Sequence, residues 1–387
     1  MFDIKSSDNE YVAGTYGRFP IEIVSGKGSL VYDANGKEYI DMGSGIGVTA
    51  FGLCDDEWVK ATSQQLATLQ HMSNLYYTEP CAKLAKLLCE KTGLKKVFFG
   101  NSGAEANECA IKVARKYASE KKGDDYFTII TLKNSFHGRT ITTLSATGQD
   151  HFHKLFNPLT DGFIHAEAGN IAQLNELVDN NKVAGIMLEC VQGEGGVIPL
   201  SADYVKAVAE IANKNDIVLI IDEVQTGNGR TGKLYSYMHF GINPDVVTTA
   251  KGLGGGLPIG ACLMGEKVKD VLGKGDHGST YGGNPVCCAG AVNIISRIDD
   301  KLLQSVSAKS EYIFNALSGQ EGIESVSGMG LIIGIKTAKP VAEVMKYCMD
   351  NGVLCLTAKD KLRLLPALNI PQEVLEKAIE IIKQACK

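Results

Sequence analysis

The 387-residue chain lacks an apolar run long enough to span a bilayer, and residues 1–10 lack the apolar core of a secretory signal. It also lacks basic runs: 39 basic against 44 acidic residues give a net charge of −5, which argues against nucleic acid or anionic membranes as partners. The 11 cysteines contain no C-x-x-C pair, which favours reduced thiols over a disulfide framework. We therefore expect a cytoplasmic protein that binds neither nucleic acid nor a membrane.

Clustered metal ligands and internal repeats are missing as well. His151 and His153 have a metal-like spacing, but no cluster of cysteine, aspartate or glutamate accompanies them, so we expect no metal site. No segment repeats, which argues against a solenoid. With 44% hydrophobic and 21% charged residues, the chain has the composition of a globular protein long enough for two or three domains.

From about residue 82, the chain alternates buried-type strands with amphipathic helices. The strand-like runs are 97–99, 127–130, 183–188, 217–221 and 246–247, and the helical patterns include 105–119, 202–213 and 267–272. Alternation of this kind predicts an α/β fold with a mostly parallel sheet covered by helices on both faces.

The two ends of the chain have different patterns. Short strand-like runs and turns fill the N-terminal part, where Asp33-Ala-Asn-Gly36 predicts a hairpin turn. A long helical pattern follows Pro285, then a strand over 328–335 and a final helix over 372–385. We expect a large domain over residues 46–286 and a small α+β domain built from residues 1–45 and 287–387.

Lys251 and Asp222 stand at the ends of two predicted strands. Asp222 follows the strand 217–221, and Lys251 follows the strand 246–247 and precedes a glycine-rich stretch. Pyridoxal 5′-phosphate (PLP) requires this combination, because a lysine forms a Schiff base with the cofactor aldehyde and a carboxylate keeps the pyridine nitrogen protonated. Ligands of open α/β sheets bind beyond the carboxyl ends of the strands, so we expect both side chains at one site.

A phosphate site is predicted where the strand 97–99 leads into a helix. Small residues at Gly103 and Ala104 let the backbone approach a phosphate, and free amides at a helix N-terminus favour an anion. A plain helix start, with Ser102 as the cap and Glu105 completing a capping box, explains the same residues. The lysine–carboxylate pair favours phosphate binding.

Other polar side chains follow further strands. In Ser135-Phe-His-Gly-Arg-Thr140, Phe136 could stack on a flat cofactor ring and Arg139 could hold a substrate carboxylate. A core phenylalanine and a surface arginine are the alternatives. Arg363 lies in an otherwise apolar strand-like run and needs a charged partner, for which Glu194 is the candidate.

Seven segments in order resemble the class III (subgroup II) PLP-dependent aminotransferases: 73–77, 100–106, 135–140, 192–196, 222–227, 250–256 and 363–366. The similarity covers nearly the whole chain. It implies a PLP-transferase fold of type I, the PLP cofactor, and an obligate homodimer with shared active sites. Within the class, the chain is most similar to the enzymes that transfer the terminal amino group of N2-acetyl-L-ornithine to 2-oxoglutarate in arginine biosynthesis.

The resemblance also implies a role for each matching residue. At the cofactor, Lys251 forms the Schiff base and Asp222 pairs with the pyridine nitrogen. The phosphate, the two ring faces and the ring oxygen are contacted by Ser102, Gly103, Ala104, Phe136, Val224 and Gln225. Thr280 reaches the phosphate from the neighbouring subunit, and Ser279 reaches the phosphate and the substrate.

The resemblance also implies three charged residues at the substrate. Arg139 binds the α-carboxylate. Glu194 pairs with Arg363 while the first substrate reacts, and then releases it for the side-chain carboxylate of 2-oxoglutarate. One site would thus accept both an ω-amine and an α-amino acid.

Two departures from the class and several alternatives stay open. Gly52-Leu-Cys-Asp-Asp56 lacks two histidines and a proline that are usual there, which we expect to change a helix start away from the chemistry, and Lys359 replaces a common glycine. Sibling enzymes act on ornithine, succinylornithine, succinyldiaminopimelate or 4-aminobutyrate, and the size of the acyl group is not evident from the sequence. A PLP lyase or isomerase of the same fold is less favoured, because the Glu194/Arg363 pair suits a transaminase with two substrates. A non-catalytic regulator is favoured least, because the cofactor positions are intact.

Overall fold

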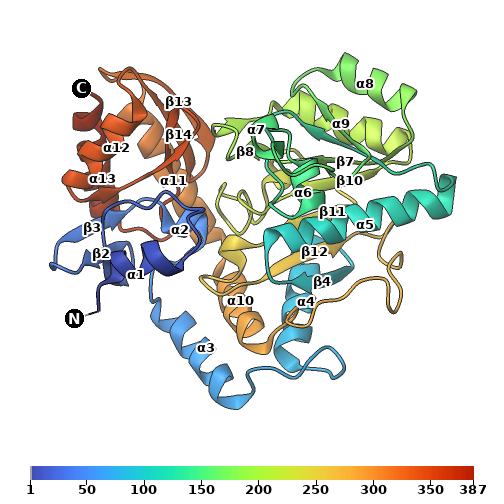
Figure 1. Cartoon of the computed structure of the whole chain (residues 1–387), viewed down its shortest axis with the longest axis horizontal. Coiled ribbons are helices and arrows are strands. Elements are labelled where there is room, and N and C mark those ends of the chain that lie inside the picture. The colour runs from blue at the N-terminus through green and yellow to red at the C-terminus, as the bar shows by residue number, and fades with distance from the viewer. Residues whose placement is uncertain (1) are drawn as a thin grey trace.

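A seven-stranded sheet forms the centre of the protein in a computed structural model that describes residues 2–387 (Figure 1). In order across the sheet, its strands are β4 (Lys96–Gly100), β12 (Gly260–Met264), β11 (Val246–Thr249), β10 (Val218–Asp222), β7 (Val183–Leu188), β5 (Thr128–Leu132) and β6 (Phe163–Ala166). β12 runs antiparallel to both of its neighbours, and the other pairs are parallel. The predicted α/β fold with a mostly parallel sheet is therefore confirmed.

Helices cover both faces of this sheet. Val218 and Ile220 of β10 pack in the core beneath α5 (Gly103–Lys122), whereas Leu219 and Ile221 pack in the core on the side of α9 (Ala202–Lys214). The other helical elements of this part are α3 (Asp56–Thr68), α4 (Glu79–Thr92), α6 (Ile141–Ala146), α7 (Asp150–His153), α8 (Ile171–Asn180), η1 (Ser236–His239), η2 (Lys251–Leu253) and α10 (Pro285–Arg297). β5 and β10 are buried along their whole length, as coverage of both faces requires.

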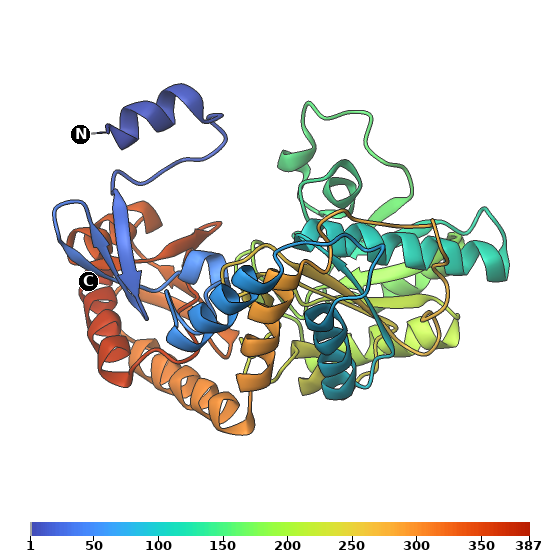
Figure 2. The same ribbon diagram turned by 90° about the horizontal axis from the view of Figure 1, so that it is seen from below.

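The two ends of the chain meet in one of the three smaller sheets. One sheet joins β1 (Ile23–Lys27), β2 (Leu30–Asp33) and β3 (Glu38–Asp41) to the C-terminal β15 (Val353–Leu354), and another has the order β13 (Ile323–Met329), β14 (Ile332–Thr337), β17 (Lys361–Leu364) and β16 (Leu356–Ala358). Around them lie α1 (Ile4–Tyr11), α2 (Ser44–Gly47), α11 (Asp300–Leu317), α12 (Val341–Asp350) and α13 (Gln372–Cys386), and a short pair is formed by β8 (Val191–Gln192) and β9 (Ile198–Pro199). Figure 2 shows both termini on the same side of the molecule. The domain boundaries at 45/46 and 286/287 stay predictions.

The structure corrects several sequence predictions. Residues 267–272, predicted as helical, form turns, because a run this short between glycines does not propagate a helix. The single strand predicted over 328–335 is part of a hairpin, in which β13 and β14 are joined at Gly330 with φ 60°. The long C-terminal helical pattern divides into α10 and α11, and the Asp299 side chain caps α11. β6 and β12 were not predicted.

Other local predictions hold. Asp33-Ala-Asn-Gly36 joins β2 to β3 as a hairpin, in which the Asp33 carboxylate accepts the amides of Asn35 and Lys37. The final helix is α13. In residues 2–387, none of the helices combines the length and the apolar character needed to cross a bilayer.

The departure at Gly52-Leu-Cys-Asp-Asp56 lies at the start of α3, as expected. Asp55 Oδ1 accepts the amide of Trp58 (3.0 Å) and so caps the helix. The same carboxylate forms a two-pronged ion pair with Arg297 of α10, with 3.0 Å between Oδ2 and Nη2. The substituted segment thus fastens α3 to α10 and takes no part in the cavity described below.

We expect Asp55→Ala to lower the free energy of unfolding by about 2–3 kcal/mol, because it removes a helix cap and a partly buried charge-assisted pair. Asp55→Asn keeps the cap and should cost less. Asp56→Asn is the matched control, since the Asp56 side chain is 90% exposed. Urea unfolding of the purified proteins measures the effect, and an Asp55→Ala midpoint equal to that of the control would contradict the assignment.

Candidate active site

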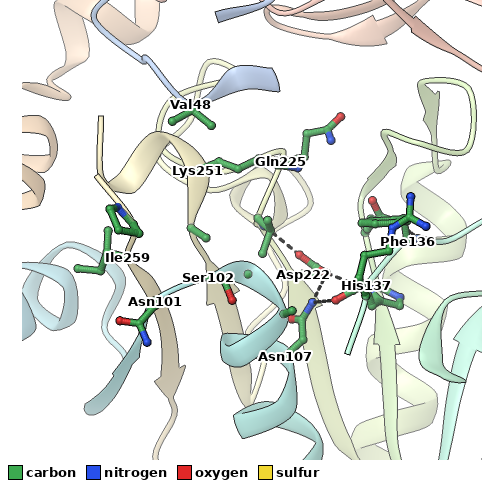
Figure 3. A pocket seen from close by; sticks show the side chains of 18 of the residues that line it. Val48, Asn101, Ser102, Asn107, Phe136, His137, Asp222, Gln225, Lys251 and Ile259 are labelled. Atoms are coloured by element: carbon green, nitrogen blue, oxygen red, sulfur yellow. Dashed lines mark hydrogen bonds and ion pairs between the residues drawn. The ribbon is translucent and has the colours of Figure 1, made fainter. Parts of the chain in front are cut away.

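A cavity of about 460 Å³ lies beyond the carboxyl ends of the central strands (Figure 3). Most of the predicted site residues line it: Ser102, Gly103, Ala104, Phe136, Arg139, Asp222, Val224, Gln225 and Lys251. They come from the segments that follow β4, β5, β10 and β11, which the parallel topology brings to one edge of the sheet. The fold therefore collects in one place what the sequence distributes over 150 residues.

Asp222 ends β10 with its carboxylate held by three donors. Oδ1 accepts the amide of Val224 (2.9 Å), and Oδ2 accepts Asn107 Nδ2 (2.8 Å) and His137 Nδ1 (2.8 Å). Asn107 also donates to the carbonyl of His137 (2.7 Å), which closes the network seen in Figure 3. A carboxylate that is 3% exposed and fixed in this way suits the pairing with a pyridinium nitrogen.

Lys251 follows β11 in a 3₁₀ turn and reaches the same cavity. Although part of the residue remains exposed, loss of hydration around its amine lowers the pKa of Lys251 below the usual lysine value, and the carboxylates of Glu194 and Asp222 oppose that shift. A lowered pKa makes the neutral amine more available as a nucleophile and as a proton acceptor.

The start of α5 offers an anion site as well as a capped helix. Ser102 Oγ accepts the amide of Glu105 (3.2 Å), so the capping predicted as the alternative is present. Helix geometry leaves the amides of Gly103 and Ala104 without intrahelical carbonyls, and both residues line the cavity. A Cβ added at Gly103 would lie 2.7 Å from Val224 Cγ1, so only glycine fits between the two loops.

Phe136 and Arg139 line the cavity from the loop that follows β5. The Arg139 guanidinium lies 5.3 Å from the Phe136 ring centroid and 4.1 Å from that of Phe152. Arg139 is exposed, and no carboxylate within residues 2–387 forms an ion pair with it. Its charge is therefore available to a ligand carboxylate.

Glu194 and Arg363 form the ion pair predicted for them. Gln225 joins it, donating to Glu194 Oε1 (3.1 Å) and accepting from Arg363 Nη1 (3.1 Å), which connects the pair to the cavity. Burial would raise the pKa of Glu194, but Arg363 outweighs that effect and holds the pKa below its usual value. Arg363 is 3% exposed, and its Nε has no hydrogen-bond partner in the described part of the chain.

Ser279 and Thr280 do not line this cavity. Ser279 Oγ accepts Asn101 Nδ2 (3.2 Å) on the outer side of the phosphate loop, and Thr280 is exposed. A single chain therefore leaves these two predicted residues outside the site.

Three buried polar residues of the site, Asn107, His137 and Glu189, had been given no individual role from the sequence. Glu189 follows β7 and lines the cavity, where Oε2 accepts the Phe136 amide (3.0 Å) and Oε1 the Gly193 amide (3.4 Å). Burial raises its pKa to about 7, with nearby His137 acting in the opposite direction. Glu189 stands directly after a buried strand, as Asp222 does, and this position is typical of site residues in open α/β sheets.

Comparison with known proteins agrees with this geometry. A model of the family described as aminotransferase class-III matches residues 11–386. The acetylornithine aminotransferase of Haemophilus ducreyi is 50% identical over 383 residues, which is 98% of each chain. That of Caldanaerobacter subterraneus subsp. tengcongensis is 43% identical and covers 97% of each chain.

Solved structures with the same fold are transaminases too. The ornithine aminotransferase of Toxoplasma gondii superposes with a TM-score of 0.95 at 31% identity, covering 99% of this chain and 94% of that one. A second structure of that enzyme, with partial occupancy of PLP at its active site, has a TM-score of 0.94 at 32% identity, covering 99% and 93%. The N-acetylornithine aminotransferase of Stenotrophomonas maltophilia has a TM-score of 0.84 at 33% identity, covering 98% and 97%.

The match over nearly the full length, together with a lysine, a buried carboxylate and a free helix N-terminus around one cavity, leads to one conclusion. The chain belongs to the class III aminotransferases and is a PLP-dependent transaminase.

Proposed function

We propose that the protein transfers the terminal amino group of N2-acetyl-L-ornithine to 2-oxoglutarate, giving N-acetyl-L-glutamate 5-semialdehyde and L-glutamate, a step of arginine biosynthesis. The observation that carries this proposal is the pair of arginines at the site. Among the described residues 2–387, Arg139 has no ion-pair partner, whereas Arg363 is paired with Glu194. The names of the relatives that are 50% and 43% identical support the same substrate.

The residues at the cavity divide the work of the reaction. PLP, when bound, supplies a protonated ring that withdraws electrons from the substrate carbon. Of the residues that line the cavity, Asp222 would keep the ring nitrogen protonated, Gly103 and Ala104 would hold the phosphate through their amides, and Phe136 and Val224 would enclose the ring. Lys251 Nζ would accept the proton from the substrate carbon that bears the amino group and would donate it to the aldehyde carbon of the cofactor.

The charged pair explains how two different substrates share the site. N2-Acetylornithine brings one carboxylate, for Arg139, while Glu194 neutralises Arg363. 2-Oxoglutarate brings two carboxylates, and the second displaces Glu194 from Arg363, whose unpaired Nε offers a further donor. We also infer that residues 46–286 form the cofactor domain and residues 1–45 and 287–387 a second domain, so that Arg363 approaches from across a domain boundary.

Ornithine is the second candidate substrate. The ornithine aminotransferase of Toxoplasma gondii has the higher TM-score of the enzymes compared above, although its identity is only 31%. Ornithine differs from N2-acetylornithine in its charged α-amine, so the discrimination depends on what surrounds the α-carbon beside Arg139.

We expect N-acetylornithine, added without a keto acid, to convert the absorbance of the bound cofactor more than about tenfold faster than ornithine or 4-aminobutyrate does, a difference of about 1.4 kcal/mol. Stopped-flow absorbance measures the three rates. The Lys251→Ala variant should show no conversion with any of them. Faster conversion by ornithine or by 4-aminobutyrate would transfer the assignment to the corresponding sibling enzyme.

We expect Arg363→Ala to raise the KM for 2-oxoglutarate about 10- to 100-fold, because a charge-assisted bond to the second carboxylate is lost. The half-reaction with N-acetylornithine should change by less than about threefold, since Arg363 is masked in that step. Arg363→Lys keeps the charge but cannot form two parallel hydrogen bonds to a carboxylate. Its KM for 2-oxoglutarate should therefore lie between those of the wild type and Arg363→Ala. Equal losses in both half-reactions would refute the masking role of Glu194.

We further propose a cytoplasmic homodimer with shared active sites. All eleven cysteines are free in the described structure, as a reducing compartment favours. Large apolar side chains are exposed around Ser279: Leu75 is 87%, Tyr77 106% and Tyr281 62% exposed. The two segments that carry them adjoin, because Asn74 Nδ2 donates to the Ser279 carbonyl (3.0 Å). An apolar patch of this kind favours contact with a second copy, whose cavity Thr280 would then reach.

Hybrid dimers test the sharing. Lys251→Ala lacks the reactive amine, and Thr280→Glu sets a negative charge against the partner's phosphate, so each should be nearly inactive alone. A purified heterodimer of the two variants has one site with both residues intact and should recover about half of the wild-type activity. Hybrids as inactive as their parents would rule out a Thr280 contribution across the interface.

A further inference from the structure

The backbone at Lys251 has an unusual conformation. Lys251 has φ 44°, in the left-handed region that residues other than glycine, asparagine and aspartate rarely adopt. Its turn is closed by two backbone hydrogen bonds, from the Leu253 amide to the Ala250 carbonyl (2.9 Å) and from the Gly254 amide to the Lys251 carbonyl (3.1 Å). A strained turn of this kind persists only where its surroundings hold it in place.

Asn228 holds the turn at Lys251 in place. Its Nδ2 donates to the carbonyl of Ala250 (3.1 Å) and to Oγ1 of Thr249 (2.9 Å), the two residues before Lys251. The Ala250 carbonyl is one of the two that close the turn. On the other side, a Cβ placed at Gly252 would lie 3.3 Å from Asn228 Cβ. Asn228 therefore binds the chain immediately before Lys251 and leaves little room for a side chain immediately after it.

Selection for stability alone would not favour an asparagine at position 228. It is 2% exposed, its own φ is 57°, and its Oδ1 has no hydrogen-bond partner anywhere in residues 2–387. A buried acceptor without a partner destabilises the fold, and a glycine would adopt the same φ without it. Residues that cost stability in this way are expected at functional sites, where their side chains serve the function.

The position of Asn228 in the chain links the two halves of the cofactor site. It lies in the segment that leaves β10 after Asp222 and that also carries Val224 and Gln225. Lys251 comes from the neighbouring strand, β11. The Asn228 amide thus ties the segment that meets the ring to the turn that carries the amine.

We propose that Asn228 is a positioning residue that aims Lys251 Nζ at the cofactor carbonyl. The inference rests on the proposed role of Lys251. In that role the amine condenses with the aldehyde, so that a C=N bond forms and one water leaves. Because both groups belong to one complex, the stability of that bond depends on the effective concentration of the amine at the carbonyl carbon. Loosening the turn lowers that concentration, so less cofactor stays bound.

A double-mutant cycle on cofactor affinity tests the proposal. Wild type, Asn228→Gly, Lys251→Ala and the double variant are stripped of cofactor, and the Kd for PLP is measured by equilibrium dialysis. Asn228→Gly should raise the Kd about tenfold in the wild-type background and leave it unchanged in the Lys251→Ala background, a coupling of about 1.4 kcal/mol. Equal weakening in both backgrounds would mean that Asn228 supports the pocket without acting through Lys251, and would overturn the proposal. An unchanged Kd in the wild-type background would overturn it too.

Two further variants serve as controls. Asp216→Gly introduces the same glycine at φ 48° in an exposed turn at the opposite end of β10, and its Kd should equal that of wild type. Asn228→Asp keeps the shape but cannot donate to the Ala250 carbonyl, and it replaces the glycine variant if that variant fails to fold; it should show the same dependence on Lys251.

A separate measurement distinguishes a wrong assignment of Lys251 from a wrong inference about Asn228. Borohydride reduction followed by peptide mapping identifies the lysine that carries the cofactor in the wild-type protein. If that lysine is not Lys251, the assignment of the reactive amine and the inference about Asn228 fall together. If it is Lys251 and the coupling is absent, only the inference about Asn228 fails.

Discussion

The buried carboxylate of Asp222 is the group on which the site depends. An ionised carboxylate at 3% exposure is stable only if donors replace its lost water, and here a backbone amide, an asparagine and a histidine do so. Each donor comes from a different element: the β10 turn, helix α5 and the loop after β5. Fixing this one carboxylate therefore fixes the relative positions of the phosphate loop, the ring-stacking loop and the central strand.

Glu189 extends the same arrangement to the next strand. By accepting the amides of Phe136 and Gly193, it joins the loop after β5 to the loop that carries Glu194. Arg363 then connects that loop to β17, in the sheet formed by the C-terminal strands. Contacts of side chains and backbone amides thus lead from the central strands to the other sheet, and a substrate carboxylate that displaces Glu194 would act on the contact between the two parts.

The sequence predicted the parts of the fold that a single chain segment determines. The central strands β7 and β10 are continuous apolar runs buried on both faces, and such runs are evident without any knowledge of their neighbours. β12 is antiparallel and follows a glycine- and proline-rich loop, so its pairing depends on β4 and β11 and not on its own pattern. Residues 267–272 have an amphipathic pattern but too few residues between glycines to form a helix.

The same limit applies to the site. Residues in strand-end motifs, such as Lys251 and Phe136, could be predicted because the motif itself places them at the edge of the sheet. The partners of Asp222 could not, since Asn107 lies 115 residues away and only the packing of α5 brings it near. Thr280 was assigned to the site by resemblance, and one chain alone leaves it exposed outside the cavity.

Backbone strain around Lys251 shows how the fold holds its reactive residue. The α2 turn is left-handed from Ser44 (φ 48°) to Gly47 (φ 73°), and the Gly47 carbonyl lies 3.5 Å from where a Gly252 Cβ would be. Gly252 is thus enclosed between this turn and Asn228. Each non-glycine residue in the left-handed region costs about 1–3 kcal/mol, so the strain accumulates on both sides of one lysine and is offset by the two large cores around it. Rigid neighbours on both sides leave the Lys251 turn few alternative conformations, and a lysine on a long flexible stem can transfer a proton with precision only from such a base.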